Sequence, residues 1–567
     1  MPEADPSPAS EPIPVELDGS VVHARRGESL AACFAGAGIK AFRTTRTGAE
    51  RGLFCGMGVC QDCLVEVDGR SNLRACMVKV EGPMRVRREA FERPPPSATV
   101  GAAPRSIDDV PVARPDVLVV GGGPAGLAAA LAARRAGARV MLLDERSAPG
   151  GQYYKQPAVP AGVQVDAQHE EGRNLVEAVR AAGVDMRANA LVWGAFAPLE
   201  FAADIGGRLV RLLPRAAIIA TGAYERAWAV PGWTLPGVMT TGAAQTLLRT
   251  AGRVPGERVL IAGNGPLNLQ LATELLAAGA AVAGVVESAE ALGLGDLGTA
   301  LRLAAASPAL AAQGLRMMAT CRKAGVPLLH GSHVAAIRSE GGALRAQIAG
   351  RQGRDIEADV VCLGYGFVPS NDLSRAIGAA HALGSGGYHL ETGRDEAGTT
   401  DIAGLFAVGD CTRISGARVA QAEGTLAGYA AAVHLGLTLS AQARAEQQAA
   451  RGAAARHHRF QRALWSLYRP TVTAPPSDAD TILCRCEEVR VRDVEAALAE
   501  GLASPGAIKR RTRLGMGRCQ GRYCAPALEA LLDAKGGRVH DAFSGFAPRV
   551  PVNPVRIADL ARPADAP

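Results

Sequence analysis

The 567-residue sequence lacks two kinds of segment that would take a chain out of the cytoplasm. Its longest apolar stretches are interrupted by Gly, Asn, Gln, Glu or Arg, so none is long enough to span a bilayer. Residues 1–11 are rich in Pro, Ala and Glu and lack the basic and then apolar order of a secretory signal. We therefore expect a cytoplasmic protein with no transmembrane segment.

Aromatic side chains are scarce, at 4% of residues. The short basic run 509–513 has no aromatic platform beside it, so we interpret it as a solvated face and expect no nucleic-acid partner. No His/Ser/Asp arrangement suggests acid–base or nucleophilic catalysis, and His457 and His458 are interpreted as surface residues. Small and apolar residues, by contrast, are abundant: the chain has 67 glycines, and 48% of its residues are hydrophobic. This composition is typical of α/β proteins, in which helices pack closely against a sheet.

Twelve cysteines are many for a cytoplasmic chain, because disulfides are rare in that compartment. Eight of them fall into two tight groups near the two ends of the chain. The other four are isolated, Cys33 being interpreted as a core residue, and no C-x-x-C stands in the middle region to form a redox-active dithiol. The grouping indicates metal binding at both ends.

The first group has the spacing C-x4-C-x2-C, with a fourth cysteine after twelve further residues. Three thiolates on a short arc and a more distant fourth are the plant-type arrangement for a [2Fe–2S] cluster, and glycines between the ligands let the backbone curl round the sulfurs. The alternatives are zinc, which more often uses two C-x2-C pairs or histidine, and unrelated buried cysteines. We predict an N-terminal [2Fe–2S] cluster held by Cys55, Cys60, Cys63 and Cys76.

The second group combines a C-x-C with a C-x4-C, separated by a stretch of helical character. It resembles the small helical [2Fe–2S] domain of bacterioferritin-associated ferredoxins (the BFD type), in which the second pair is normally C-x2-C. Because the spacing departs from that pattern, zinc is the main alternative at this site. We predict a second [2Fe–2S] cluster held by Cys484, Cys486, Cys519 and Cys524.

A glycine-rich turn follows the apolar strand expected at 117–120, and a second expected strand, 140–143, ends in two acidic residues. In a G-x-G-x-x-G turn the first glycine makes the bend, the second admits a pyrophosphate, and the third lets helix and strand pack closely. The acid after the second strand bonds the ribose hydroxyls. We predict a dinucleotide site formed by Gly121, Gly123, Pro124, Ala125, Gly126, Asp144 and Glu145.

Three further segments indicate that this dinucleotide is FAD. Residues 218–222 resemble the strand-turn that crosses between the domains of flavoprotein disulfide-reductase-like enzymes, and 405–410 resemble their second FAD motif. The segment 149–152 stands where that family passes backbone near the flavin. We interpret Cys411 as a packed side chain rather than a residue that tunes the flavin. The segments add Gly151, Gln152, Thr221, Gly222, Gly409 and Asp410 to the predicted FAD site.

A second, less regular glycine motif follows the apolar run 259–262, with Asn268 in place of the third glycine. In the related reductases this domain binds NAD(P)H. No Arg pair follows Glu287 to hold a 2′-phosphate, which disfavours NADPH. The helical stretch 292–323 also occupies the region where a nicotinamide site is expected. Three states stay open for this domain: NAD bound, another adenine nucleotide bound, or a fold retained for structure alone.

These features predict an α/β protein with two Rossmann-like dinucleotide-binding domains in a disulfide-reductase-like flavoprotein core. An N-terminal α+β ferredoxin-like domain and a small helical C-terminal iron–sulfur domain flank this core. The predicted boundaries are 12–84 for the ferredoxin-like domain, 85–115 for a linker, 116–230 with 355–440 for the FAD domain, 231–354 for the second nucleotide-binding domain, 441–479 for a helical connector, 480–535 for the BFD-like domain and 536–567 for an extended tail.

Taken in order, the modules resemble the large subunits of heteromeric flavin dehydrogenases, and the segments 220–226 and 231–240 resemble that group specifically. The group includes opine oxidase, hydrogen cyanide synthase, D-hydroxyproline dehydrogenase and dye-linked proline dehydrogenase, and the alpha chain of sarcosine oxidase is a relative. The resemblance implies a second FAD-dependent oxidase-like subunit that oxidises the C–N bond of an amine or amino acid. This chain would then pass the electrons to an acceptor that the sequence does not identify.

The same resemblance leaves room for FMN at a subunit interface and for membrane association through a partner or an acceptor. Two other functions stay open. A working second nucleotide site would favour a self-sufficient NADH:acceptor oxidoreductase, and a vestigial flavin site would favour a non-catalytic binding or scaffold subunit.

Overall fold

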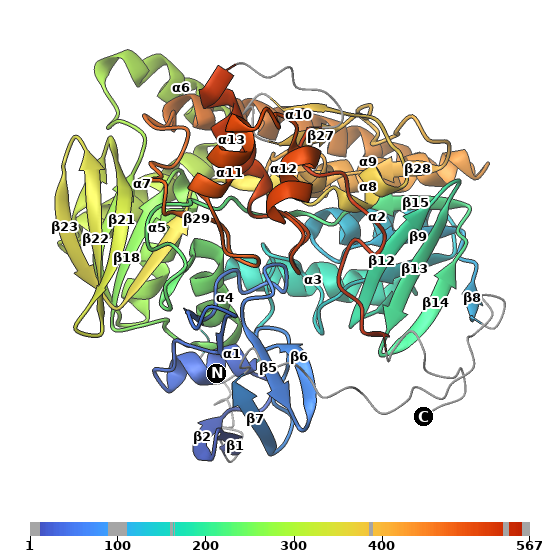
Figure 1. Cartoon of the computed structure of the whole chain (residues 1–567). Helices are drawn as coiled ribbons and strands as arrows, with labels where there is room; N and C mark the ends of the chain where they lie inside the picture. Colours follow the sequence, from blue (N-terminus) through green and yellow to red (C-terminus); the bar gives the residue numbers. More distant parts are fainter. Residues whose placement is uncertain are drawn as a thin grey trace.

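The structure is a computed structural model that describes residues 12–88, 110–158, 163, 165–384, 389–536 and 544–557. In Figure 1 the N-terminal module (blue) lies below two nucleotide-binding domains that stand side by side, and the C-terminal module (red) lies above the middle. Across the described residues, no helix combines the length and the apolar character that a bilayer crossing requires.

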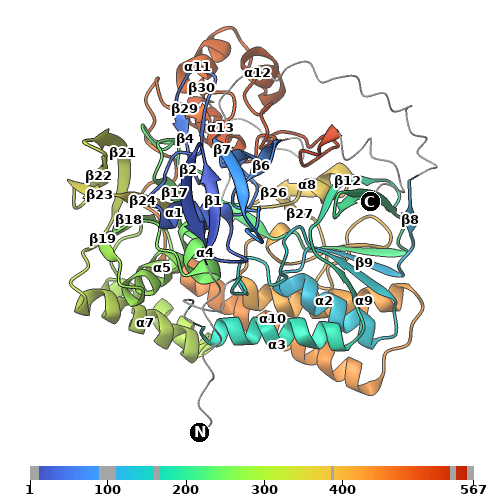
Figure 2. The ribbon, with the colours of Figure 1, turned by 90° about the horizontal axis from the view of Figure 1, so that it is seen from below.

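The N-terminal module is a five-stranded mixed sheet, β2-β1-β7-β5-β6, with one helix. That helix begins after Ser29, whose hydroxyl accepts a hydrogen bond from the backbone N–H of Ala32. The strand β7 pairs with both β1 and β5 and extends to Arg88, so the predicted linker 85–115 began too early (Figure 2). Residues 89–109 of that linker lie outside the described residues. The elements are β1 (Ile13–Leu17), β2 (Ser20–Ala24), α1 (Leu30–Gly36), β3 (Arg43–Thr44), β4 (Glu50–Arg51), β5 (Leu64–Val67), β6 (Arg70–Arg74) and β7 (Met84–Arg88).

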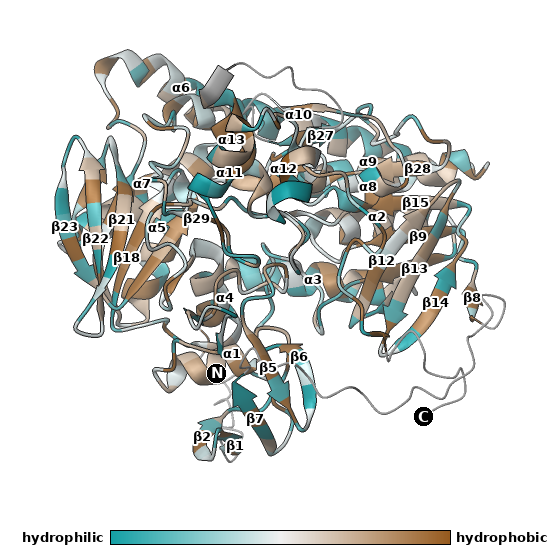
Figure 3. Ribbon diagram, in the orientation of Figure 1, coloured by the Kyte–Doolittle hydropathy of each residue, from teal (hydrophilic) through white to brown (hydrophobic). Residues whose placement is uncertain are grey.

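The first nucleotide-binding domain is built on a parallel sheet of order β11-β10-β9-β15-β28. Three helices (α2, α3, α9) cover one face and the antiparallel strands β12, β13 and β14 cover the other, so the central strands are apolar on both sides (Figure 3). The elements are β8 (Val112–Ala113), β9 (Val117–Val120), α2 (Pro124–Arg135), β10 (Val140–Leu143), α3 (Ala167–Ala181), β11 (Asp185–Arg187), β12 (Ala190–Phe196), β13 (Glu200–Ile205), β14 (Arg208–Leu212), β15 (Ala216–Ile219), β28 (Leu405–Ala407), η3 (Gly409–Cys411) and α9 (Ala417–His434).

The second nucleotide-binding domain repeats this plan with a parallel sheet, β17-β24-β18-β19-β20. Because β24 pairs with β17 and β18, the predicted return to the first domain at residue 355 was too early: the chain leaves the second sheet only after Gly364. The elements are β17 (Val238–Thr240), α4 (Thr241–Ala251), β18 (Arg258–Gly263), α5 (Pro266–Ala277), β19 (Ala281–Glu287), η2 (Leu294–Asp296), α6 (Leu297–Ala306), α7 (Pro308–Lys323), β20 (Leu328–His330), β21 (Ser332–Glu340), β22 (Ala343–Gly350), β23 (Arg354–Ala358) and β24 (Val360–Gly364).

Short strands cross between the two domains, and a long helix, α10, leads to the C-terminal module. The tail returns to the first domain, where the N–H of Val552 donates to the carbonyl oxygen of Trp193 on β12 at 2.8 Å. The remaining elements are β16 (Ala223–Glu225), β25 (Phe367–Pro369), α8 (Asp372–Ala376), β26 (His381–Leu383), β27 (Leu390–Thr392), α10 (Ala441–Leu467), β29 (Ile482–Cys484), β30 (Val489–Arg490), α11 (Val491–Ala499), α12 (Pro505–Thr512) and α13 (Ala525–Gly536).

Two apolar cores join the modules. One core runs from the N-terminal sheet into the helical face of the second nucleotide-binding domain. The other contains Phe54, Cys55 and Cys60 of the N-terminal module together with the interior of the C-terminal module. The two predicted cluster domains, which lie at opposite ends of the sequence, therefore meet in one core.

A buried arginine ties together three helices near the interface of the two nucleotide-binding domains. The Arg249 side chain on α4 is 4% exposed and donates to both carboxylate oxygens of Asp166, at 2.8 and 2.9 Å, and to Glu274 on α5 at 2.9 Å. Asp166 is the N-cap of α3 and also holds His169. The network spans elements that are distant in sequence.

We expect Arg249→Met to lower the free energy of unfolding by about 3–5 kcal/mol, because it leaves partly buried carboxylates without their cation. Denaturant unfolding followed by circular dichroism measures the change. The control is Arg187→Met, which removes an exposed pair with Asp185 and should change stability by no more than about 0.5 kcal/mol. Equal effects of the two substitutions would show that the Arg249 network does not stabilise the interface.

Candidate functional site

A cavity of about 700 Å³ lies between the two nucleotide-binding domains, which is within the size range of cofactor sites. Its wall brings together predicted FAD residues from five separate segments of the chain. Two predicted residues lie behind the wall instead: Gly126 packs against the carbonyl oxygen of Gly121, and Gly409 packs against Ala125. The predicted residues that line the cavity are Gly121, Gly123, Pro124, Ala125, Asp144, Glu145, Gly151, Gln152, Thr221, Gly222 and Asp410.

The glycine-rich turn opens toward this cavity at the start of α2. Gly121 has φ +107°, a conformation that requires glycine, and a Cβ there would lie 2.4 Å from the carbonyl oxygen of Ala220. Gly123 is the N-cap, with no side chain bonded to the first N–H groups of the helix. A Cβ on Gly123 would meet no atom closer than Gly151 Cα at 3.8 Å. The turn thus leaves open space at a helix N-terminus, where a pyrophosphate fits.

Two carboxylates on the wall are held by backbone N–H groups. Asp144 accepts from Gly122 at 2.7 Å and from Arg146 at 2.8 Å, and burial raises its pKa to about 6. One oxygen of Asp410 accepts from the N–H groups of Ser415 and Gly416, at 2.8 and 2.9 Å. Both side chains are therefore fixed in orientation before any ligand binds.

The wall also contains two buried charged residues that the sequence interpretation missed. Burial lowers the pKa of Lys155 to about 7, and its Nζ donates to the Gln152 carbonyl at 2.7 Å and to Gln245 Oε1 at 3.0 Å. Burial likewise raises the pKa of Glu225 to about 7, although the N–H of Gly242 donates to it at 2.8 Å. Glu225 lies within the segment 220–226, but no local pattern marks the burial of either charge, because their partners Gln245 and Gly242 lie on α4 of the second domain.

The second glycine motif has a comparable backbone but a more crowded approach. Gly265 has φ +107°, and its N–H donates to Glu287 at 2.9 Å. Asn268, at the third-glycine position, is buried and bonds Gly364 O and Thr241. A Cβ on Gly265 would lie 3.1 Å from the ring of Trp465 on α10. The occupancy of this second site stays a prediction.

The N-terminal cysteines lie on a loop whose N–H groups point at the sulfurs. The N–H of Cys60 donates to Cys55 Sγ at 3.4 Å, and that of Asp62 donates to Cys60 Sγ at 3.5 Å. The neighbouring Cys63 thiol, together with burial, holds the pKa of the Cys76 thiol well above its usual range. N–H groups aimed at thiolates, in a loop that curls round the sulfurs, fit a [2Fe–2S] group.

The C-terminal cysteines also converge, despite the wider C-x4-C spacing. Cys484 contacts Cys486 and Cys524, and Cys486 contacts Cys519. A Cβ on Gly517 would lie 2.1 Å from the Cβ of Cys486, so the cage closes tightly there. Among the described residues, no three Cys, His, Asp or Glu side chains are already arranged around a single ion. The choice between iron and zinc therefore does not rest on the positions of the sulfurs.

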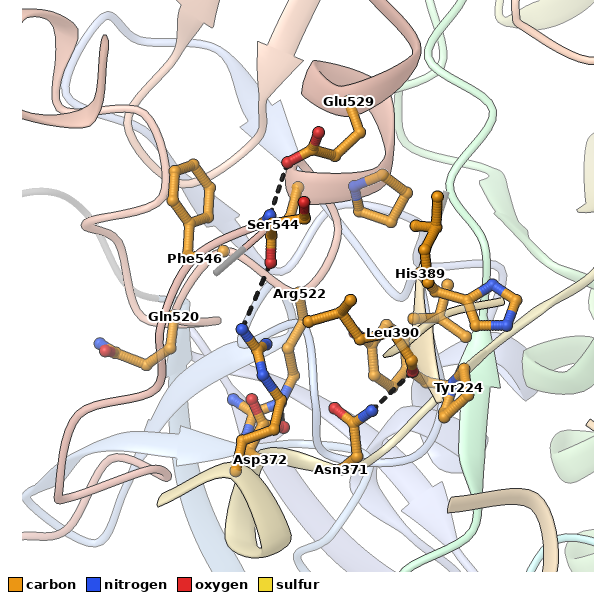
Figure 4. A pocket seen from close by; sticks show the side chains of 18 residues that line it. Tyr224, Asn371, Asp372, His389, Leu390, Gln520, Arg522, Glu529, Ser544 and Phe546 are labelled. Carbon is orange, nitrogen blue, oxygen red and sulfur yellow. Dashed lines mark hydrogen bonds and ion pairs between the residues drawn. The ribbon is translucent and has the colours of Figure 1, made fainter. Parts of the chain in front are cut away.

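A smaller cavity, of about 60 Å³, separates the C-terminal module from the first nucleotide-binding domain (Figure 4). Arg522, from the C-terminal cysteine loop, makes an ion pair with Asp372 at 3.0 Å. Both residues and Tyr224 line the large cavity as well as the small one. These three side chains therefore form a wall between the two spaces, with the second cysteine loop directly behind the predicted flavin site.

Three family models match the chain in the order in which the modules occur. A "2Fe-2S iron-sulfur cluster binding domain" matches residues 10–90, "Pyridine nucleotide-disulphide oxidoreductase" matches 115–424, and a "BFD-like [2Fe-2S] binding domain" matches 482–534. The matches confirm the predicted fold class: a disulphide-oxidoreductase flavoprotein core between two iron–sulfur domains.

Curated relatives extend over most of the chain. An opine oxidase subunit of Agrobacterium tumefaciens (strain Ach5) is 35% identical over 460 residues, covering 79% of this chain and 91% of the relative. The hydrogen cyanide synthase subunit HcnB of Pseudomonas aeruginosa is 32% identical, covering 77% of this chain and 96% of the relative. Among solved structures, L-proline dehydrogenase from P. horikoshii shares the fold, with a TM-score of 0.69 over 97% of this chain and 98% of that chain, at 18% identity. The chain therefore belongs to the family of FAD subunits that includes this opine oxidase component, HcnB and the alpha chain of sarcosine oxidase, with an N-terminal 2Fe-2S domain and a C-terminal BFD-like domain.

Proposed function

We propose that this chain is the electron-transferring subunit of a heteromeric dehydrogenase or oxidase whose substrate is an amine or amino acid of the opine, hydroxyproline, sarcosine or glycine type. The observation that carries the proposal is the shared cavity wall: Cys55, Met57 and Val59 of the N-terminal cysteine loop line the same space as the predicted FAD residues. A flavin accepts electrons in pairs and a [2Fe–2S] centre carries one at a time, so together they convert hydride chemistry into single-electron flow.

In this proposal the chain's own residues bind the flavin, fix its orientation and form the walls around it. With FAD bound, the N-terminus of α2 would offer its first N–H groups to the pyrophosphate, and Asp410, held by the Ser415 N–H, would bond the ribityl chain. Lys155 and Glu225, each with a pKa of about 7, can hold or release a proton at Nζ and at the carboxylate within the buried wall. The helices α6, α7 and α10 line the cavity on the side of the second domain, mainly with apolar side chains such as Leu303, Met318 and Leu464.

The proposal includes a partner. Relatives of this chain are named as subunits of an oxidase and a synthase, which supports a second FAD-dependent oxidase-like subunit that carries the substrate pocket. FMN at the interface between the two subunits is part of the same proposal. NADH is disfavoured as the electron source because the ring of Trp465 lies against the second glycine motif, 3.1 Å from the Cβ position of Gly265.

An anaerobic NADH titration of the purified holo-chain, followed by visible absorbance, tests the proposal. We expect no bleaching of the flavin and cluster bands by stoichiometric NADH and complete bleaching by dithionite. Co-expression with a candidate partner flavoprotein of the glycine/D-amino-acid oxidase type should then make the bands bleach with an opine or amino-acid substrate. Bleaching by NADH alone would overturn the proposal in favour of a self-sufficient NADH:acceptor oxidoreductase.

A further inference from the structure

The two cysteine loops are linked directly by a buried ion pair. Asp62 stands between the predicted ligands Cys60 and Cys63, and Arg485 stands between Cys484 and Cys486. The Asp62 and Arg485 side chains, 1% and 3% exposed, form an ion pair with 2.5 Å between Arg485 Nε and Asp62 Oδ2. A residue inside one predicted ligand pair thus contacts a residue inside the other.

The arginine side chain is enclosed by rings from the N-terminal loop and the second domain. Its guanidinium carbon lies 4.0 Å from the ring centroid of Phe54 and 4.8 Å from that of Trp233. Its Nη1 donates a hydrogen bond to the Trp233 carbonyl oxygen at 2.7 Å. Stacking on two rings and a fixed hydrogen bond hold the charge in one place. Because the side chain is almost fully buried, bulk water does not screen this charge.

The charges around the pair do not cancel. Arg43 also bonds Asp62, at 2.8 Å, and the buried Arg51 bonds Glu488 at 3.1 Å. The contact between the loops therefore holds three guanidinium groups and two carboxylates, an excess of one positive charge (+3 and −2). Burying this excess requires a compensating negative charge nearby.

Aromatic side chains next to the ligands also touch. Phe54 precedes Cys55 and Tyr523 precedes Cys524, and their ring centroids are 5.2 Å apart. Tyr523 in turn lies 5.5 Å from Tyr224, which lines the large cavity. A short packed path therefore joins the predicted flavin site and both cysteine loops.

We propose that the two iron–sulfur centres form one directly coupled pair, with Arg485 as the positioning residue that raises the reduction potentials of both. This inference rests on the proposed function. Each one-electron reduction adds a negative charge, and a fixed cation between two centres in a medium of low dielectric stabilises both reduced states. One electron can then cross from one centre to the other through the Phe54–Tyr523 contact: the donor centre is oxidised by one electron, the acceptor centre is reduced by one, and no bond or proton moves.

Electron paramagnetic resonance of the wild-type holo-chain during a reductive titration is the decisive measurement. When both centres are reduced, we expect spectra broadened or split by spin–spin interaction, beyond the sum of the two signals seen at partial reduction. Fully reduced spectra that equal that sum would overturn the inference. Wild-type chain without iron and acid-labile sulfide would instead sink the proposed function itself, so the two failures are distinguishable.

Potentiometric titration of variants tests the role of Arg485. In Arg485→Gln both potentials should fall by at least the equivalent of a tenfold change in the one-electron equilibrium, which is about 59 mV. Arg485→Lys, which keeps the charge, should retain most of the wild-type values. Arg511→Gln, which removes the same charge from an exposed pair with Glu500 in the same module, should shift neither. A shift confined to the C-terminal centre would overturn the shared role, and if Arg485→Gln does not fold, the wild-type spectra still decide the coupling.

Discussion

A Gly123→Val variant should fold normally and purify without bound flavin. In the structure a Cβ on Gly123 meets nothing nearer than 3.8 Å, and its φ of −79° is open to any residue, so we expect the fold to accept a side chain here. The same side chain points into the space between the turn and Gly151, where a pyrophosphate would approach the N-terminus of α2. We expect flavin content, measured by absorbance after denaturation, to fall at least tenfold while the circular dichroism spectrum is unchanged.

Two further glycine variants make this result specific. Gly452→Val places the same side chain on the exposed surface of α10, where a Cβ meets no atom within 4 Å, and should keep full flavin content. Gly126→Val should fail to fold, because its Cβ would lie 1.8 Å from the Gly121 carbonyl oxygen. If Gly123→Val retained stoichiometric flavin, the turn would not be the pyrophosphate site, and the interpretation of a scaffold protein with a vestigial motif would gain weight.

The second large effect concerns the C-terminal cluster. Cys519→Ser should reduce the iron and acid-labile sulfide content of the holo-chain by about half, because a [2Fe–2S] centre needs four thiolates. The electron paramagnetic resonance signal of the N-terminal centre should persist. Stability should also fall, because a group that binds only the folded state contributes its binding free energy to folding.

Cys60→Ser should produce the mirror result, with the N-terminal signal lost and the C-terminal signal kept. Cys33→Ala is the matched control: Cys33 is equally buried in the core of the N-terminal module but stands outside the predicted ligand pattern, so iron content should not change. A different result would reassign the C-terminal site as a zinc site. The wild-type chain would then contain zinc and only half the expected iron, and Cys519→Ser would leave that iron content unaltered.

Local sequence patterns were sufficient to predict the separate modules. Each glycine turn was recognisable because strand, turn and helix are consecutive, and the structure places β9, α2 and β10 where the spacing predicted them. The cysteine groups were recognisable for the same reason, since each group lies within a short segment. The second glycine motif was recognisable in the same way, because β18 ends at Gly263 and β19 ends at Glu287, as its spacing predicted.

Boundaries were less accurate because strand pairing is not local. The strand β7 has the composition of a polar, Arg-rich linker, yet it is central in its sheet through pairing with β1 and β5. The strand β24 lies close to the first domain in sequence, yet it pairs with β18, about a hundred residues earlier. A sheet selects its neighbours by backbone geometry, which composition does not reveal.

What the sequence by itself determined is the set of modules and the residues most directly suited to cofactors, because glycine and cysteine chemistry depends on short-range spacing. What only the tertiary structure decided is how the modules meet. Asp62 and Arg485 are separated by 423 residues, and Lys155 and Glu225 come from different segments of the first domain. The interaction energy and the pKa of a charged group depend on the charges and the dielectric around it, and those surroundings exist only once the chain has folded.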